Sequence, residues 1–210
     1  MEESFRERLE KVDPSIRHAM IGEELDELLK SALKSFASIP KVSKWAREKE
    51  LVSWFVIEHL LPLVKEGGIL AHPGQVGIDV AVPQHRTPEN PRKNPDVCKD
   101  VVIWSYPDMT CWNEEGIANV HPISVIEWKS WNKRDRPAQR KSKMKTFAEY
   151  DLPWLQKTVQ SVEEFVGYGV LADVTNERIE LACVRTRGTG GGIITQLDWF
   201  KTAGGPDLCL

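Results

Sequence analysis

The sequence has few cysteines and no pairing pattern among them. Its four cysteines are Cys98, Cys111, Cys183 and Cys209, and no two form a Cys-x-x-Cys pair. This wide spacing argues against a zinc knuckle and gives no disulfide framework. We expect reduced thiols that are buried in the core or lie at the surface.

Long hydrophobic runs are also absent. No apolar stretch approaches the roughly 20 residues that cross a bilayer. The longest stretches, such as Leu60 to Val64, are short and flanked by charged residues. The first six residues are acidic and polar, which is not typical of a secretory signal. The sequence therefore predicts a cytoplasmic protein that does not interact with a membrane.

Basic residues are not in excess overall, but they are unevenly distributed. The net charge is -3, so no global positive field points to nucleic acid. The segment from residue 129 to 145 has Asp135 as its one acid and eight basic residues: Lys129, Lys133, Arg134, Arg136, Arg140, Lys141, Lys143 and Lys145. We expect a loop here, either simply solvated or in contact with a nucleic-acid backbone.

The length and composition indicate one domain with short extensions. The chain has 210 residues, of which 41% are hydrophobic and 28% are charged, as in ordinary globular domains. We expect an N-terminal helical extension over residues 1–40, in which Asp13-Pro14 starts a helix and Ile39-Pro40 ends the unit. The domain itself spans residues 41–190. Residues 191–210 form a tail, preceded by a flexible glycine-rich connector at Gly188 to Gly192 that lacks a phosphate-binding Gly-Lys-Ser/Thr.

The pattern of apolar residues predicts an α/β fold with a mixed central sheet flanked by helices. A helix over Lys44 to Val64, capped by Ser43, comes first. The strands that follow are Val76–Val82, Asp100–Trp104 and Ile123–Lys129. Next come a helix, Leu152–Val166, and two strands joined by a tight turn, Gly167–Val174 and Ile179–Thr186.

Two charged residues end the otherwise apolar strand Ile123–Lys129. Because side chains alternate along a strand, Glu127 and Lys129 share one face with Ile123 and Val125. Burying such charges is costly unless they pair or bind a ligand. The acid Asp100 opens another buried strand. If the two strands are neighbours, one acid from each meets beside Lys129.

Two carboxylates and a lysine have a well-defined use in phosphate chemistry. Carboxylate oxygens are the hard ligands that Mg²⁺ prefers, and bound Mg²⁺ lowers the pKa of a water molecule and neutralises phosphate charge. The lysine can orient or deprotonate the attacking water and stabilise the transition state. The Glu-x-Lys triplet alone is a weak signal. Its single occurrence at a strand end, 27 positions after Asp100, is more specific.

Over residues 44–187 the chain resembles the PD-(D/E)xK nuclease superfamily, the fold of many restriction and DNA-repair enzymes. The resemblance rests on the helix segment Glu48-Lys49-Glu50-Leu51-Val52, the strand Lys99 to Trp104, and Ile126-Glu127-Trp128-Lys129. It implies a restriction-endonuclease-like core in αβββαβ order, with Asp100, Glu127 and Trp128 at the metal and Lys129 assisting hydrolysis. A glutamate of the first core helix completes such a site. Here that glutamate is Glu50, with Glu48 as the alternative.

The literal Pro-Asp dipeptide of the family motif falls at Pro95-Asp96, four residues before Asp100. We prefer Asp100 because it adjoins the apolar strand, and Asp96 stays the alternative.

The resulting hypothesis is a Mg²⁺-dependent endonuclease that hydrolyses DNA, with Mn²⁺ able to substitute. The expected nucleic-acid contacts are Lys133, Arg134, Arg136 and Arg140, and a homodimer that cuts both strands is possible. Three alternatives remain: a nuclease for RNA or branched DNA, a nuclease-fold binding or assembly module, and a structural domain with a Glu127–Lys129 salt bridge. Trp112 and Trp131 are candidates for base stacking, although packing is the simpler role.

Overall fold

We describe the chain from a computed structural model that covers residues 3–84, 96–105, 121–162, 164–189 and 192–208. Trp112, one of the two tryptophans considered for base stacking, lies outside the described residues. No helix within these ranges combines the length and the apolar character needed to span a membrane.

Six strands form a single mixed sheet in the order β1-β2-β3-β4-β5-β6. Only β3 and β4 pair in parallel among neighbouring strands, and the other pairs are antiparallel. The strands are β1 (Val76–Pro83), β2 (Asp96–Ile103), β3 (Ser124–Trp131), β4 (Val166–Asp173), β5 (Glu180–Thr189) and β6 (Gly192–Lys201). The expected α/β class with a mixed sheet flanked by helices is confirmed.

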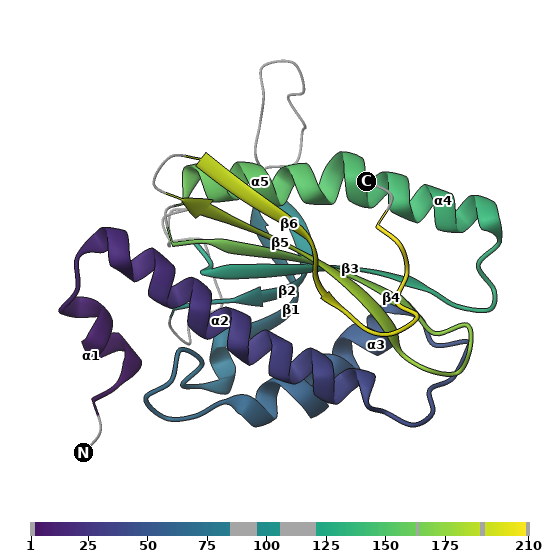
Figure 1. The fold of residues 1–210 in the computed structure, drawn as a ribbon, viewed down its shortest axis with the longest axis horizontal. Helices are drawn as coiled ribbons and strands as arrows, with labels where there is room; N and C mark the ends of the chain where they lie inside the picture. The colour runs from purple at the N-terminus through teal and green to yellow at the C-terminus, as the bar shows by residue number, and fades with distance from the viewer. Residues whose placement is uncertain (1–2, 85–95, 106–120, 163, 190–191, 209–210) are drawn as a thin grey trace.

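Helices cover both faces of this sheet (Figure 1). α1 (Phe5–Glu10), α2 (Pro14–Ala37) and α3 (Glu48–Phe55) lie on one side, and α4 (Pro137–Thr146) and α5 (Leu152–Ser161) lie on the other. The crossover between the parallel strands β3 and β4 runs through α4 and α5, as parallel pairing requires. Apolar side chains fill the two interfaces, with Trp128 under α2 and α3 and Val125 under α5.

The first core helix is shorter than its sequence pattern predicts. α3 begins at Glu48, and Ser43 instead accepts a hydrogen bond from the N–H of Trp45. After Phe55 the chain widens into a π-helical turn and then a 3₁₀ turn, Val56–Leu60 and Leu61–Leu63. The change comes just before Pro62, whose missing N–H removes a helical hydrogen bond.

The basic segment after β3 is a helix rather than a loop, which corrects the sequence prediction. The loop proper is confined to residues 132–136. α4 starts at Pro137, a favourable first helical position, and the Gln139 side chain accepts a hydrogen bond from the N–H of Arg136. At its far end the helical crossover stops at Ser161 rather than Val166, since Val166 already opens β4.

Both expected chain extensions belong to the common sheet and core. β5 ends at Thr189 and β6 begins at Gly192, and the two strands pair from Ala182–Lys201 to Thr189–Gly192. Gly190 and Gly191 of the expected connector lie outside the described residues. Residues 192–201 of the expected tail therefore form a strand. At the N-terminus, α2 buries Leu25, Leu29 and Phe36 in the same cluster as Trp128. The boundaries at residues 40 and 190 do not separate independent cores.

Candidate active site at the opening between β2 and β3

The candidate site lies where β2 and β3 separate. Their paired residues run from Val101–Ile126 to Ile103–Ser124, so pairing stops just before Asp100. Beyond that point the Asp100 Oδ2 atom accepts a hydrogen bond from the N–H of Trp128 at 2.8 Å. A carboxylate thus replaces the missing strand partner, which places Asp100 between the two strands beside the Glu-x-Lys triplet.

In both β1 and β2, the faces on which the side chains lie are reversed at this point. Asp79, which lies opposite Asp100 in the register, has a φ of 59°. In a regular strand Val76 and Val82 would share a face, yet Val76 packs in the cluster under α2 and α3 and Val82 in the cluster under α5. The reversal brings Lys99 to the α5 side of the sheet, the side that carries Glu127. Asp100 instead lines a cavity of about 120 Å³ with residues of α3 and β1.

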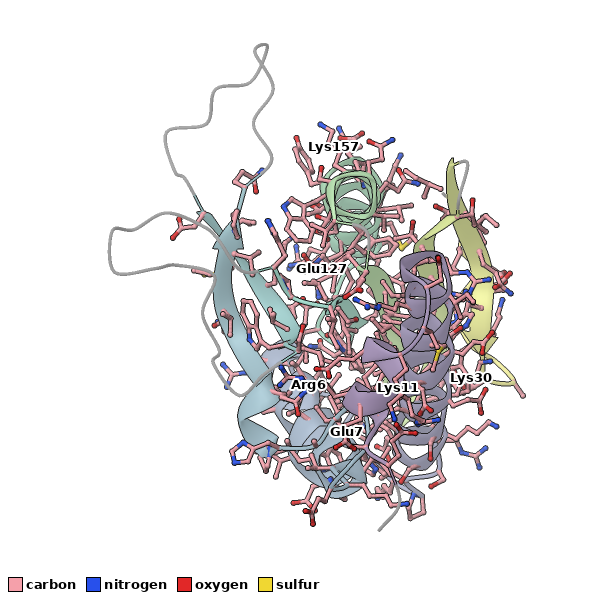
Figure 2. The ribbon with its side chains drawn as sticks, turned by 90° about the vertical axis from the view of Figure 1, so that its left-hand side faces the viewer. Arg6, Glu7, Lys11, Lys30, Glu127 and Lys157 are labelled. Atoms are coloured by element: carbon pink, nitrogen blue, oxygen red, sulfur yellow. The ribbon has the colours of Figure 1, made fainter. Side chains whose placement is uncertain are left out.

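Glu127 is buried, with 4% of its surface exposed, and Figure 2 shows it in the interior of the molecule, unlike Lys157 at the periphery. Its Oε1 atom forms an ion pair with the Nζ atom of Lys99, which is equally buried. That ammonium also lies 4.0 Å from the centre of the Trp154 ring. Burial raises the pKa of Glu127 to about 7 because desolvation outweighs the attraction of Lys99.

Lys129 lies on the same face and is held at two points. Its Nζ atom forms an ion pair with Asp151 Oδ2 at 2.9 Å and donates to the Trp128 carbonyl at 2.8 Å. Burial by itself lowers the pKa of Lys129, but the ion pair with Asp151 and the negative charges of Glu48 and Asp100 together outweigh it, and the pKa is raised. Lys129 is therefore protonated near neutral pH, so it suits charge stabilisation rather than proton abstraction.

The helix glutamate beside the site is Glu48, which corrects the expected Glu50. Glu48 Oε2 accepts the N–H of Ser130 at 2.8 Å, and burial raises its pKa against the attraction of Lys129. The side chain of Glu50 is 52% exposed and binds the main-chain N–H and guanidinium of Arg47. The periodicity of the helix explains why Glu48 rather than Glu50 lies at the site, because Glu48 shares its face with the buried Leu51 and Phe55.

Trp128 contributes only main-chain atoms at this edge. Its indole packs on the opposite face against the rings of Phe36 and Phe55, with centroids 5.9 and 5.2 Å away. Its N–H binds Asp100 and its carbonyl accepts from Lys129. The alternative acid Asp96 begins β2 opposite Pro83. It lies four residue steps along the strand from Asp100, about 13 Å, which favours Asp100 as the acid of the site.

The four basic residues expected at nucleic acid fall beside the site but differ in exposure. Lys133, Arg134 and Arg136 are exposed on the loop before α4, whereas Arg140 is partly buried and donates to the Asp135 carbonyl. The guanidinium of Arg134 lies 5.5 Å from the centre of the Trp45 ring.

Three further residues complete this region, and the sequence interpretation assigned none of them to the site. Lys143 anchors the basic segment, since its Nζ atom binds the Ser130 carbonyl at 2.7 Å and Asp135 at 2.8 Å. Asp151 holds Lys129, and Lys99 holds Glu127. Lys99 adjoins Asp100 in the sequence and could have been noticed there. Asp151 and Lys143 lie on the crossover helices, and no local pattern points to them.

The donor chemistry at this edge fits a hard divalent cation. Glu48, Asp100 and Glu127 supply carboxylate oxygens from three different elements. Within the described ranges, no three His, Cys, Asp or Glu side chains are grouped closely enough to hold a metal ion. The carboxylates are instead engaged by two main-chain N–H groups and by the ammonium of Lys99.

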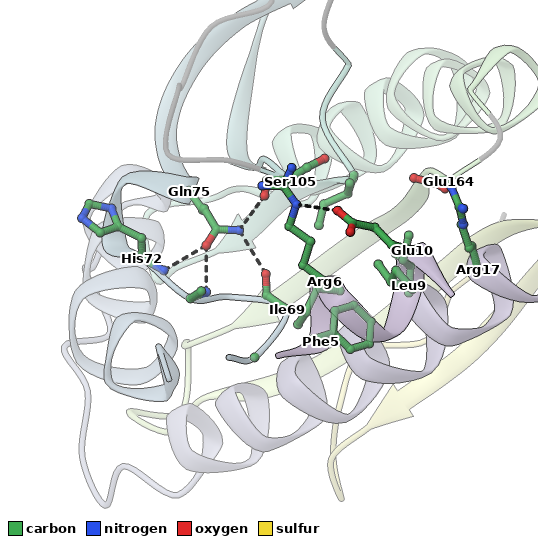
Figure 3. Close-up of a pocket in the computed structure, with 14 residues that line it drawn as sticks. Phe5, Arg6, Leu9, Glu10, Arg17, Ile69, His72, Gln75, Ser105 and Glu164 are labelled. Atoms are coloured by element: carbon green, nitrogen blue, oxygen red, sulfur yellow. Dashed lines mark hydrogen bonds and ion pairs between the residues drawn. The ribbon is translucent and has the colours of Figure 1, made fainter. Parts of the chain in front are cut away.

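A cavity of about 380 Å³ lies away from this site, between α1, α2 and the segment before β1 (Figure 3). Its buried amide, Gln75, is fully engaged: Oε1 accepts from the N–H of Ala71 and His72, and Nε2 donates to the carbonyls of Ile69 and Trp104. No described acid or lysine of the β2–β3 opening lines this cavity.

Comparison with protein-family models, curated proteins and solved structures gives no match for this chain.

Proposed function

We propose that this protein is a metal-dependent nuclease that hydrolyses phosphodiester bonds of DNA, built on a restriction-endonuclease-like core. The observation that carries the proposal is that Glu48, Asp100, Glu127 and Lys129 lie around the opening between β2 and β3, near enough to influence one another electrostatically. Acids and a protonated lysine at one partly buried edge suit a reaction in which negative charge builds up on phosphate.

Each side chain has a separate role in this proposal. Asp100 and Glu127, with Glu48 from the helix, are the residues that would hold Mg²⁺ or Mn²⁺. When bound, the metal supplies an activated water and neutralises phosphate charge. Lys129 stabilises the additional negative charge on the scissile phosphate, and Asp151 keeps it oriented and protonated. The exposed Lys133, Arg134 and Arg136 bind the DNA backbone nearby.

A cleavage assay tests the proposal. Wild type and Lys129→Ala are incubated with supercoiled, linear and single-stranded DNA, and with RNA, in Mg²⁺, Mn²⁺ or EDTA. We expect metal-dependent cleavage of DNA that falls by at least about 100-fold in the variant, the usual scale for losing one electrostatic stabiliser. Preferred cleavage of RNA or branched DNA would keep the chemistry and change the substrate.

Two variants of neighbouring glutamates test which of them belongs to the site. Glu48→Gln removes a carboxylate at the site, whereas Glu50→Gln changes an exposed residue two positions away on the same helix. We expect a loss of at least about tenfold for Glu48→Gln and nearly wild-type cleavage for Glu50→Gln. Equal activity of the two variants would remove Glu48 from the site.

One observation favours a second candidate, a nucleic-acid-binding or assembly module without cleavage activity. The buried Lys99 and the partly buried Lys129 are each already paired with an acid, Lys99 with Glu127 and Lys129 with Asp151. A well-folded wild type that binds nucleic acid, leaves every substrate intact with metal, and loses binding on Lys129→Ala would establish this second candidate.

A further inference from the structure

Lys99 is the residue of the site that the proposed chemistry does not use. It forms an ion pair with Glu127, and the two side chains are only 3% and 5% exposed. A buried ammonium is costly to desolvate, and its partner here is one of the proposed metal ligands. A positive charge of the chain itself therefore occupies a carboxylate that a divalent cation would need.

We propose that Lys99 is a built-in counter-cation that competes with the divalent metal for Glu127, so that metal binds only as the Lys99 ammonium leaves this carboxylate. The inference rests on the proposed function, because it assumes that Glu127 is a metal ligand. It adds a mechanism that sets metal affinity and keeps the metal-free protein folded.

The position of Lys99 is set by the fold, and Lys99 is not a mobile side chain at the surface. Regular alternation would place Lys99 with Val101 on the α2 side of the sheet. Because the side-chain faces of β1 and β2 reverse at Asp79 and Asp100, Lys99 lies on the α5 side instead. The face of the Trp154 ring then supports the ammonium at 4.0 Å. Three elements thus cooperate to hold one charge against Glu127.

Lys129 does not compete in the same way. Its ammonium is held by Asp151 and by the Trp128 carbonyl, not by Glu127. The two lysines therefore have separate tasks: Lys99 neutralises the acid when no metal is bound, and Lys129 stays available to the phosphate. The pairing of Glu127 with Lys99 is consistent with the spacing of the acids, since no three acids of the described residues are grouped closely enough to hold a metal ion.

The test measures metal binding without nucleic acid. Lys99→Met removes the charge and keeps an unbranched side chain, and Mn²⁺ binding is followed by isothermal titration calorimetry. We expect Lys99→Met to bind Mn²⁺ at least tenfold more tightly than wild type. Its metal-free thermal midpoint should fall, because Glu127 loses its partner, and saturating Mn²⁺ should raise that midpoint more than in wild type.

Lys49→Met is the matched control for a general change in charge. Lys49 also pairs with an acid beside the site, Asp79, but its side chain is 82% exposed. We expect its Mn²⁺ affinity to stay within about threefold of wild type, because exposed charges are screened. A gain equal to that of Lys99→Met would show a general charge effect and overturn the inference.

The other outcomes separate this inference from the proposed function. Wild type that binds Mn²⁺ while Lys99→Met binds it equally or more weakly overturns the inference alone. Absence of Mn²⁺ binding in both proteins overturns the proposed metal site and the inference with it. If Lys99→Met is unfolded, folding on addition of Mn²⁺ supports the inference. If it stays unfolded at saturating Mn²⁺ while Lys99→Met/Glu127→Gln folds, the inference is wrong.

Discussion

At the scale of single residues, the burial of Glu127 couples this carboxyl to the stability of the whole fold. Its pKa is raised from 4.5 to about 7, chiefly because burial penalises the charged form. Between these two pH values the folded protein binds more protons than the unfolded chain. The stabilising contribution of Glu127 is therefore complete below pH 4.5 and is lost as the pH rises to about 7.

This loss of stability with rising pH gives a prediction for Glu127→Gln. The variant should lack the part of the stability decrease between pH 4.5 and 7 that Glu127 causes in the wild type, on the order of 3 kcal/mol at most. Urea unfolding of both proteins at several pH values in this window, without metal, measures the difference in slope.

Glu50→Gln is the control, since the pKa of Glu50 is lowered by its hydrogen bonds to Arg47. Its stabilising effect is present above the ordinary pKa and is lost only at lower pH. Parallel curves for wild type and Glu127→Gln would mean that Glu127 titrates normally.

At the scale of secondary-structure elements, the crossover helices are fitted closely to β4. Gly169 pairs with Glu127 across the parallel strands, and a Cβ atom added there would lie 2.2 Å from the ring of Phe147. Phe147 is fully buried at the end of α4. A glycine at this position thus lets the crossover pack directly over the strand pair that carries Glu127.

We expect Gly169→Ala to destabilise the protein by about 1–3 kcal/mol, because the added methyl group overpacks a buried ring. Chemical denaturation measures the loss, and Gly192→Ala, where an added Cβ meets nothing within 4 Å, should be nearly neutral. Gly169→Ala combined with Phe147→Leu should recover part of the stability. No rescue by the smaller side chain would point to a backbone cause instead.

The loop between β3 and α4 is the element expected to bind the DNA backbone. Lys133 and Arg136 are exposed there, and Lys143 ties the neighbouring Asp135 to the site. Replacing both exposed residues by alanine should weaken DNA binding similarly for all sequences, and each lost phosphate contact should reduce the salt slope by about 1. Fluorescence anisotropy in EDTA at several salt concentrations measures both effects.

Lys157→Ala, on the outer side of α5 (Figure 2), is the control and should leave affinity and salt slope unchanged. If this control weakened binding as much as the loop variant, DNA would not bind preferentially at the loop.

At the scale of the whole molecule, α2 is part of the core that supports the site. Phe36 lies edge-on to Trp128, the residue between Glu127 and Lys129. Asp26 accepts a hydrogen bond from Tyr168 and pairs with Arg185, both at 2.8 Å and largely buried. The helix therefore closes one face of the sheet and neutralises a buried cation.

A chain that starts at residue 41 should consequently lose cooperative unfolding, since it exposes the apolar face under α2 and leaves Arg185 unpaired. Thermal unfolding followed by circular dichroism tests this. A chain that starts at Asp13 lacks only α1 and should keep a cooperative, less stable transition. A cooperative transition for residues 41–210 would restore the domain boundary expected from the sequence.

The sequence by itself determined the elements with strong local patterns. Short runs of apolar and β-branched residues marked β1 to β5, and the order of helix and strands predicted the mixed sheet. Alternation along β3 also placed Glu127 and Lys129 on one face, and the start of an apolar run singled out Asp100. These features depend on neighbours within a few residues, which a sequence displays directly. The basic helix α4 and the strand β6 were missed because their apolar patterns are weak and their partners are distant.

Only the tertiary structure decided which charged residues meet. Glu48 replaced Glu50 because the start of α3, three residues after Trp45, fixes the helix phase. The change at Asp79 and Asp100 reversed the faces that alternation predicts and brought Lys99 to Glu127. Asp151 reaches Lys129 from the crossover, 22 residues away along the chain. Such contacts depend on how strands and helices are placed in space. The physical reason is that a buried charge is stable only beside a partner of opposite charge, and that partner can lie far away in the sequence.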